Sequence, residues 1–253
     1  MTTPTITIKN LTLHWQQPLF DDFTIQLNAG KWTALLGTSG VGKSTLLRFI
    51  AGLLPTSSDK NANIIISDNK PLKNRLSYMA QEDCLLPWLN AMDNILLPYR
   101  LTGKKITTAI KQQVLELLRQ LGLNHATHLT PEKLSGGMRQ RVALARIFFD
   151  NKPIVLMDEP FSALDTITRL KLQDVAAELL ANKTVLMVTH DPLEALRLAD
   201  EIYVMTDQPV QLSDPILLNS PRPRNIENQE LITQQSQLLS LLAKKNTQEA
   251  TLC

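Results

Sequence analysis

Nine consecutive residues, "GTSGVGKST" from Gly37 to Thr45, have the composition of a phosphate-binding loop. The apolar stretch "WTALL" precedes them, and the helical stretch "KSTLLRFIAGLL" overlaps their end. Glycines allow a loop to wrap closely around a phosphate, so that its N–H groups point inward. In this pattern Lys43 brings a positive charge to the β- and γ-phosphates of a nucleotide, and the Ser44 hydroxyl is a ligand for Mg²⁺. An ordinary Gly/Ser-rich turn is the alternative, and the strand and helix on either side argue against it.

Two adjacent carboxylates follow a second apolar stretch, in the sequence "PIVLMDEP". A buried strand that delivers a carboxylate to a phosphate loop can hold Mg²⁺, and this role falls to Asp158. Successive side chains of a strand point in opposite directions, so Glu159 is free for another task, that of general base for an attacking water. Taken alone, the pair could equally be an acidic turn, but the phosphate loop favours catalysis.

Gln81 and His190 are two further candidates. Gln81 ends the expected strand "RLSYMA", and its neutral amide can reach Mg²⁺ or the attacking water and swing away without leaving a buried charge. His190 follows the expected strand "TVLMVT", at the carboxyl end where open α/β sheets bind ligands, and its imidazole could contact a γ-phosphate. Position alone leaves both roles open.

A second anion-binding stretch is indicated by "PEKLSGGMRQR", from Pro131 to Arg141. Ser135 suits the N-cap of a helix, and the free N–H groups and the dipole of a helix N-terminus favour negative charge. The stretch has no lysine that completes it as Lys43 completes the first loop. The sequence therefore predicts a second, incomplete anion site on a different helix.

These side chains must be positioned by a layered arrangement of strands and helices. "TITIKNLTLHW" and "FTIQL" predict antiparallel strands, and the strand–helix alternation from "PIVLM" to "EIYVM" predicts a parallel α/β sheet. The helical pattern of residues 83–150 predicts a lobe inserted between the two. One helix in this lobe, ended by Gly122, is expected from an apolar stripe at Ile106, Ile110, Val114, Leu117, Leu118 and Leu121. We expect one α/β domain over residues 1–214 and a C-terminal tail over 215–253 that begins extended and becomes an amphipathic helix.

Composition narrows the class of protein. The 253 residues carry 26 basic and 24 acidic side chains, a balance that does not favour a nucleic-acid partner. Two cysteines, Cys84 and Cys253, suggest no disulfide framework. No apolar stretch approaches the roughly 20 residues needed to span a bilayer. We therefore expect a soluble or peripheral protein, with any membrane part supplied by another chain.

Together the motifs resemble the ATP-binding subunit of ABC transporters, a family of P-loop NTPases. The order is "GTSGVGKST" (Walker A), Gln81 (Q-loop), "LSGGMRQR" (signature), "IVLMDEP" (Walker B), "SALD" (D-loop) and Thr189-His190 (switch histidine). The match runs from about Ile6 to about Met205. It implies a RecA-like parallel-sheet core, an antiparallel β lobe and an inserted α-helical lobe. Met138 departs from the glutamine that many members carry in the signature.

The resemblance also assigns roles. It implies that Ser44, Gln81 and Asp158 hold Mg²⁺ or its waters, that Glu159 is the catalytic base, and that His190 senses the γ-phosphate. An aromatic side chain near the first strands usually stacks on adenine; Trp15 is the candidate, with Phe20, or a core role for Trp15, as the alternatives. The residues that would contact ATP are Trp15, Gly37, Thr38, Ser39, Gly40, Val41, Gly42, Lys43, Ser44, Thr45, Ser135, Gly136, Gly137 and Asp165.

A head-to-tail dimer, as this family forms, would explain the incomplete second anion site. Each "SGG" would close over the γ-phosphate that is held by Lys43 of the other copy, so both sites would be complete only in the pair. Asp165, in "SALD", would lie across the same interface, although Ser, Ala and Asp suit any loop.

The stretch from Gln81 to Leu101 is similar to that of importers for nitrate, sulfonate and taurine, and for pyrimidine precursors of thiamine. In those systems a transmembrane permease contacts this region; the apolar residues Leu85, Leu86, Pro87 and Trp88 would line that groove or form the core of the lobe. We expect an ATP-hydrolysing importer subunit, peripheral on the cytoplasmic face of the inner membrane, that works with a permease and indirectly with a solute-binding protein. A soluble ABC ATPase acting on nucleic acid or the ribosome is the alternative.

Overall fold

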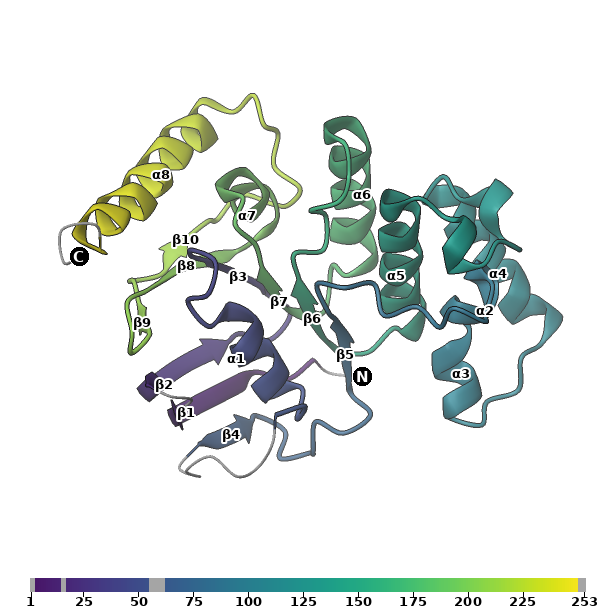
Figure 1. Cartoon of the computed structure of the whole chain (residues 1–253), viewed down its shortest axis with the longest axis horizontal. Coiled ribbons are helices and arrows are strands. Elements are labelled where there is room, and N and C mark those ends of the chain that lie inside the picture. The colour runs from purple at the N-terminus through teal and green to yellow at the C-terminus, as the bar shows by residue number, and fades with distance from the viewer. Residues whose placement is uncertain (1–2, 15–16, 55–61, 250–253) are drawn as a thin grey trace.

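The computed structural model describes residues 3–14, 17–54 and 62–249, and Figure 1 shows their arrangement. A small antiparallel sheet contains β2 (Pro18–Leu27), β1 (Ile6–His14) and β4 (Asn63–Ile66), in that order. Alternate residues of β1, such as Ile6 and Ile8, are fully buried while their neighbours are not. The period-two pattern of the sequence therefore forms the predicted antiparallel β lobe.

The larger sheet, which has seven strands in the described chain, is mainly parallel. Its order is β10-β8-β3-β7-β6-β5, with β9 paired to β8. The parallel strands are β3 (Trp32–Leu36), β5 (Leu76–Met79), β6 (Ile154–Asp158), β7 (Thr184–Val188) and β8 (Glu201–Thr206); β9 (Gln211–Leu212) and β10 (Ile216–Leu217) pair antiparallel. Every residue of β3, β6 and β7 is buried, as the continuous apolar stretches predict.

The two faces of this sheet are covered by different elements. Ala34 and Leu36 pack with the helices α5 (Gly136–Asp150), α6 (Thr166–Leu179) and α7 (Pro192–Leu198). Leu35, which points the other way, packs with the β lobe and α1 (Lys43–Ile50). The central strands are thus buried on both sides, and their carboxyl ends open onto the loops that carry the candidate site residues. The predicted α/β, P-loop type of fold is confirmed.

The inserted lobe is helical, as expected, and lies at one end of the molecule (Figure 1). It contains α2 (Ala91–Ile95), α3 (Leu97–Leu101), α4 (Thr108–Gln120), two short 3₁₀ turns (Asn124–Ala126 and Pro131–Lys133), and α5. The predicted stripe is buried at Val114, Leu117 and Leu118. Ile106 lies before the helix rather than in it, because the Thr107 hydroxyl accepts a hydrogen bond from Ile110 N and caps α4 at that point.

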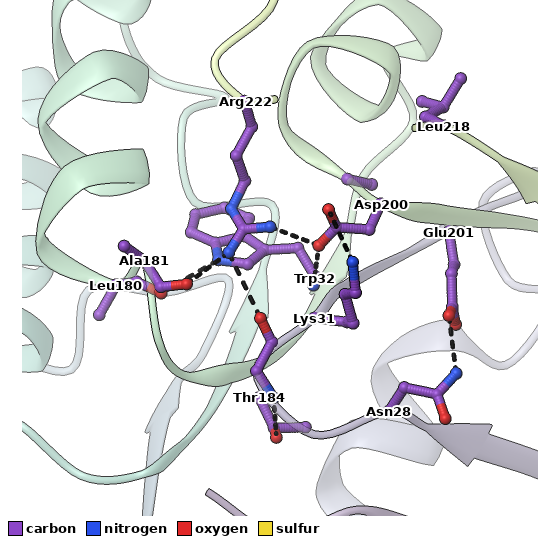
Figure 2. A network of polar contacts seen from close by, with 12 residues as sticks. Asn28, Lys31, Trp32, Leu180, Ala181, Thr184, Asp200, Glu201, Leu218 and Arg222 are labelled. Atoms are coloured by element: carbon purple, nitrogen blue, oxygen red, sulfur yellow. Dashed lines mark hydrogen bonds and ion pairs between the residues drawn. The ribbon is translucent and has the colours of Figure 1, made fainter. Parts of the chain in front are cut away.

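The C-terminal segment is joined to the sheet before its helix begins. β10 pairs with β8, and the Arg222 side chain reaches back to Trp32, the first residue of β3, as Figure 2 shows. Its guanidinium pairs with Asp200, donates to Ala181 O at 2.6 Å, and lies 5.5 Å from the centre of the Trp32 ring. The final helix, α8 (Gln229–Glu249), then packs on α7 through the buried side chains of Leu231 and Leu238. The division at residue 214 stays a prediction, but the two parts share one core. No described helix is both long and apolar enough to cross a membrane.

Candidate nucleotide-binding site

The loop between β3 and α1 needs glycine at three positions for reasons of geometry. Gly40 and Gly42 have φ values of 85° and 112°, which other residues rarely adopt. A Cβ atom at Gly37 would lie 2.7 Å from Met205 O. The loop is therefore held against β8 at its start, while Thr38, Ser39 and Gly40 are exposed at its tip. The free N–H groups of this loop and of the start of α1 are suited to an anion.

Lys43 is the charge at the centre of this loop. Its side chain is 7% exposed, and Nζ donates to Gly37 O at 2.8 Å and to Thr38 O at 2.7 Å. Burial lowers the pKa of the Lys43 ammonium, and the negative charges of Glu159 and Asp158 oppose that change. The structure thus brings together the lysine of the loop and both predicted carboxylates.

Asp158, the last residue of β6, is a deeply buried carboxylate. It is 1% exposed, and neither oxygen accepts a hydrogen bond of ordinary geometry from the described residues. Burial raises the pKa of the Asp158 carboxyl; the nearby Ser44 side chain lowers it and Glu159 raises it further. A buried carboxylate beside a hydroxyl provides the oxygen ligands that Mg²⁺ prefers, so these residues fit the ion together with nucleotide phosphates.

Glu159 and His190 lie together, although they come from different loops. Glu159 Oε1 is 3.2 Å from His190 Nδ1, and the Glu159 side chain is 18% exposed whereas that of His190 is 62% exposed. The strand register accounts for this, because Asp158 pairs with Val188 in adjacent parallel strands and Glu159 N donates to Val188 O. A carboxylate next to an exposed imidazole, beside the phosphate loop, can accept a proton from water and contact a phosphate.

Glu159 lies outside the strand, contrary to the sequence prediction. Strand alternation was expected to set the direction of its side chain, but β6 ends at Asp158, and Glu159 has a φ of 49°. This left-handed conformation is costly for a residue other than glycine and is maintained by its surroundings. The direction of the Glu159 side chain is therefore set by this turn, rather than by the pleat of the strand.

Gln81 is exposed and lies two residues beyond the end of β5. In the described chain no hydrogen bond joins its amide to Ser44 or Asp158. The structure therefore leaves this side chain at the edge of the site, and its role as a magnesium ligand stays a prediction.

Ser135 is the N-cap of α5, as predicted, and its Oγ accepts a hydrogen bond from Met138 N at 3.2 Å. Ser135 and Gly136 are exposed on the helical lobe. Gly137 packs more closely, since a Cβ atom there would lie 3.2 Å from Ala163 O in the loop after β6. Asp165 ends that loop and caps α6 by accepting a hydrogen bond from Thr168 N, which lowers the pKa of its carboxyl.

The two candidates for an adenine-stacking residue have different outcomes. Trp15 lies outside the described residues, so its role stays a prediction. Phe20 is fully buried and packs edge-on against Phe23, with ring centres 4.9 Å apart. Phe20 is therefore a core residue, and the suggestion that it stacks on adenine is wrong, because neither face of its ring is accessible.

Three polar residues near the site were not singled out from the sequence. Gln140 contacts the loop after Glu159, and Arg169 donates to both Leu164 O and Asp191. Glu194, one helical turn after His190, is 5% exposed, and burial raises the pKa of its carboxyl to about 8. The one signal for Glu194 was its spacing from His190; Gln140 and Arg169 look like ordinary polar helix residues until the fold brings them to these loops.

Comparison with known proteins agrees with this geometry. Residues 20–162 match the sequence family described as ABC transporter. An uncharacterized ABC transporter ATP-binding protein of Haemophilus influenzae is 42% identical, over 94% of this chain and 98% of its own length. The aliphatic sulfonates import ATP-binding protein SsuB 1 of Rhodococcus jostii is 38% identical, over 91% of this chain and 90% of its own.

Among solved structures, a dimer of the ATP-binding cassette MJ0796 in a post-hydrolysis state, bound to ADP and Pi, has a TM-score of 0.73. It is 28% identical, and the match covers 85% of this chain and 99% of that one. Sequence family, relatives and fold agree on one assignment: the chain belongs to the ATP-binding subunits of ABC transporters, and it is an ATPase.

Proposed function

We propose that this chain is the ATP-hydrolysing subunit of an importer for a small solute, and that it works as a head-to-tail dimer beneath separate transmembrane subunits. The observation that carries the proposal is the Glu159–His190 pair, which lies beside Lys43 and the unpartnered carboxylate of Asp158. The proposed location is the cytoplasmic face of the inner membrane, where the chain would be a peripheral protein.

Each residue of the site has a distinct proposed role. Lys43 neutralises the β- and γ-phosphates, while the Walker A loop from Gly37 to Thr45 surrounds them with N–H groups. Ser44 and Asp158, with Gln81, hold Mg²⁺, which when bound neutralises charge that develops on the phosphates. Glu159 accepts the proton of the attacking water, and His190, 3.2 Å away, contacts the γ-phosphate.

A second copy of the chain would supply the remaining contacts. Ser135, Gly136 and Gly137 are at the surface or near it, at the N-terminus of a helix of 15 residues, so they can face an anion on another molecule. Asp165 lies in the loop against which Gly137 packs. This arrangement gives two equivalent sites related by a two-fold axis.

The proposed permease surface is the loop that follows Gln81. Leu85 is buried in the lobe, but Pro87 is exposed and Trp88 is 73% exposed. The fully buried Asn94 holds this loop rigidly: its amide donates to Leu86 O and Leu89 O, and its carbonyl accepts from Leu86 N. A rigid loop that presents a tryptophan to solvent is suited to binding a protein partner.

The proposed cargo is an aliphatic sulfonate or a related small solute, such as nitrate, taurine or a pyrimidine precursor of thiamine. Several relatives that are 37–38% identical are named as aliphatic sulfonates import ATP-binding proteins. The cargo would bind the solute-binding protein of the system, so titration of that protein with each solute is the direct test. Tight binding of a solute outside these classes would contradict the choice.

Two variants test the catalytic and dimer roles separately. Glu159→Gln should bind ATP, accumulate as an ATP-bound dimer and release phosphate at least 100-fold more slowly, because the base is absent. Ser135→Arg should bind ATP as a monomer but neither dimerise nor hydrolyse it. Gel filtration with ATP and a phosphate-release assay measure both. Wild-type hydrolysis by either variant would refute the role given to that residue.

A further inference from the structure

Gln140 is a buried amide on the signature helix whose hydrogen bonds all go to the loop after β6. It is 6% exposed and lies on α5, five residues after Ser135. Nε2 donates to Glu159 O at 3.2 Å and to Ser162 Oγ at 3.3 Å. Oε1 accepts from Ala163 N at 3.0 Å. The donor and the acceptor of the amide thus hold two different points of one loop.

The loop that Gln140 holds carries the proposed base. Glu159 has the left-handed φ of 49°, a conformation that persists only when neighbouring groups fix it. Within the loop, Ser162 Oγ donates to Glu159 O at 3.1 Å, and Gln140 adds a donor to the same carbonyl from another element. Rotation of this peptide would move the Glu159 carboxylate away from His190.

Gly137 provides a second, independent contact between the same helix and the same loop. It lies three residues before Gln140, on the same face of α5. A Cβ atom at Gly137 would be 3.2 Å from Ala163 O and 3.5 Å from Leu164 Cδ2. The first turn of α5 therefore packs closely against both the backbone and a side chain of the loop Glu159–Asp165.

We propose that Gln140 is a positioning residue that joins the two ATP sites of the dimer. This inference rests on the proposed function, in which Ser135 of one chain closes over the nucleotide at one site while Glu159 of the same chain acts at the other site. Closure of the signature helix over a nucleotide then sets the orientation of Glu159 at the opposite site. Glutamine suits this position because it supplies a donor and an acceptor at once without a buried charge.

The test compares Gln140→Met with Gln173→Met. The second variant also replaces a buried glutamine, but one on α6 that accepts a hydrogen bond from Arg197 of α7 and, in the described chain, makes no hydrogen bond to the loop after β6. Gln140→Met should bind ATP within about twofold of the wild type, and in the Glu159→Gln background it should still form the ATP-bound dimer. Its kcat should fall 10- to 100-fold, because Glu159 would be slightly misplaced. Its Hill coefficient for ATP hydrolysis should approach about 1, because the two sites would no longer be coupled. Gln173→Met should keep the wild-type kcat and Hill coefficient.

Gln140→Glu is the second variant, and it is used if Gln140→Met does not fold. It keeps the acceptor for Ala163 N but lacks the donor to Glu159 O, so the same loss of kcat and cooperativity is expected. If a folded Gln140 variant has the wild-type kcat and cooperativity while Glu159→Gln is inactive, this inference is wrong and the proposed function stands. Wild-type hydrolysis by Glu159→Gln itself would instead overturn the proposed function.

Discussion

Glu194 gives a prediction about stability and pH. It lies on α7, one turn after His190; Oε1 has no hydrogen-bond partner in the described chain, and burial, together with the charge of Asp191, raises the pKa of the carboxyl to about 8. Arg169 and Thr189 oppose that rise, and Glu159 adds to it. We expect Glu194 to be protonated in the folded protein at pH 7, when it would be ionised in the unfolded chain.

The sign and size of the effect follow from the two pKa values. Between pH 4.5 and 8 the folded state binds more protons at Glu194 than the unfolded state does, so the free energy of unfolding falls as the pH rises. At 1.36 kcal/mol per pKa unit, the loss attributable to this group between pH 5 and pH 8 is about 3 kcal/mol. Glu194→Gln has nearly the same shape and does not titrate, so it should lack this loss.

Urea unfolding of both proteins, followed by tryptophan fluorescence from pH 5 to pH 8, measures the difference. For each protein we take the change in the free energy of unfolding between pH 5 and pH 8. Subtracting the change for Glu194→Gln from that for the wild type cancels the titration of all other groups. We expect the variant to be more stable than the wild type at pH 8 by a few kcal/mol. Parallel pH profiles for the two proteins would refute the reasoning, because Glu194 would then be ionised when folded.

Three other substitutions test other parts of the molecule. Arg222→Met keeps an apolar contact with Trp32 but removes one ion pair of Asp200, whose side chain is 13% exposed and which keeps the hydrogen bond from Trp32 N. It should lower the free energy of unfolding by about 3 kcal/mol, the low end of the cost of breaking a buried ion pair. Lys31→Met, at the exposed end of the same network, should cost less than about 1 kcal/mol, and urea unfolding measures both values. Asp158→Asn should stabilise the nucleotide-free protein by about 1 kcal/mol, because it replaces a buried carboxylate, whose charged form burial disfavours, with a neutral amide. The same change should abolish Mg²⁺-dependent phosphate release, and release at the wild-type rate would contradict the role given to Asp158. Trp88→Ala should leave ATPase activity of the isolated subunit unchanged but reduce co-purification with the permease at least tenfold, and equal recovery of both proteins would place the docking surface elsewhere.

The parts of the fold that the sequence predicted are those governed by local rules. The glycines of the phosphate loop, the buried β3 and β6, and the cap at Ser135 follow from spacing and composition within a few residues. The end of α4 at Gly122, with a φ of 66°, is another such case. Each of these features can be predicted because the residues that determine it lie within a few positions of it in the sequence.

Other features depend on contacts between distant parts of the chain and left no pattern to detect. The amide of Gln140 meets Glu159 only because the start of α5 packs against the loop after β6, and Phe20 is inaccessible only because the β lobe folds over α1. The left-handed turn at Glu159 has no glycine to mark it. Arg222, in "SPRPRN", lies in the stretch that was predicted only to be extended, yet it donates a hydrogen bond to Gly30 O, near the other end of the chain.

The contact between Arg222 and Trp32 also bears on how the protein is made. β3 leaves the ribosome early, with the phosphate loop directly behind it, but its neighbours β7 and β8 and the arginine that covers Trp32 are synthesised much later. Until then the nascent strand has no partners in its sheet, and its apolar residues are exposed to any chaperone present. The phosphate loop therefore reaches its place in the finished sheet only after β7 and β8 have been synthesised.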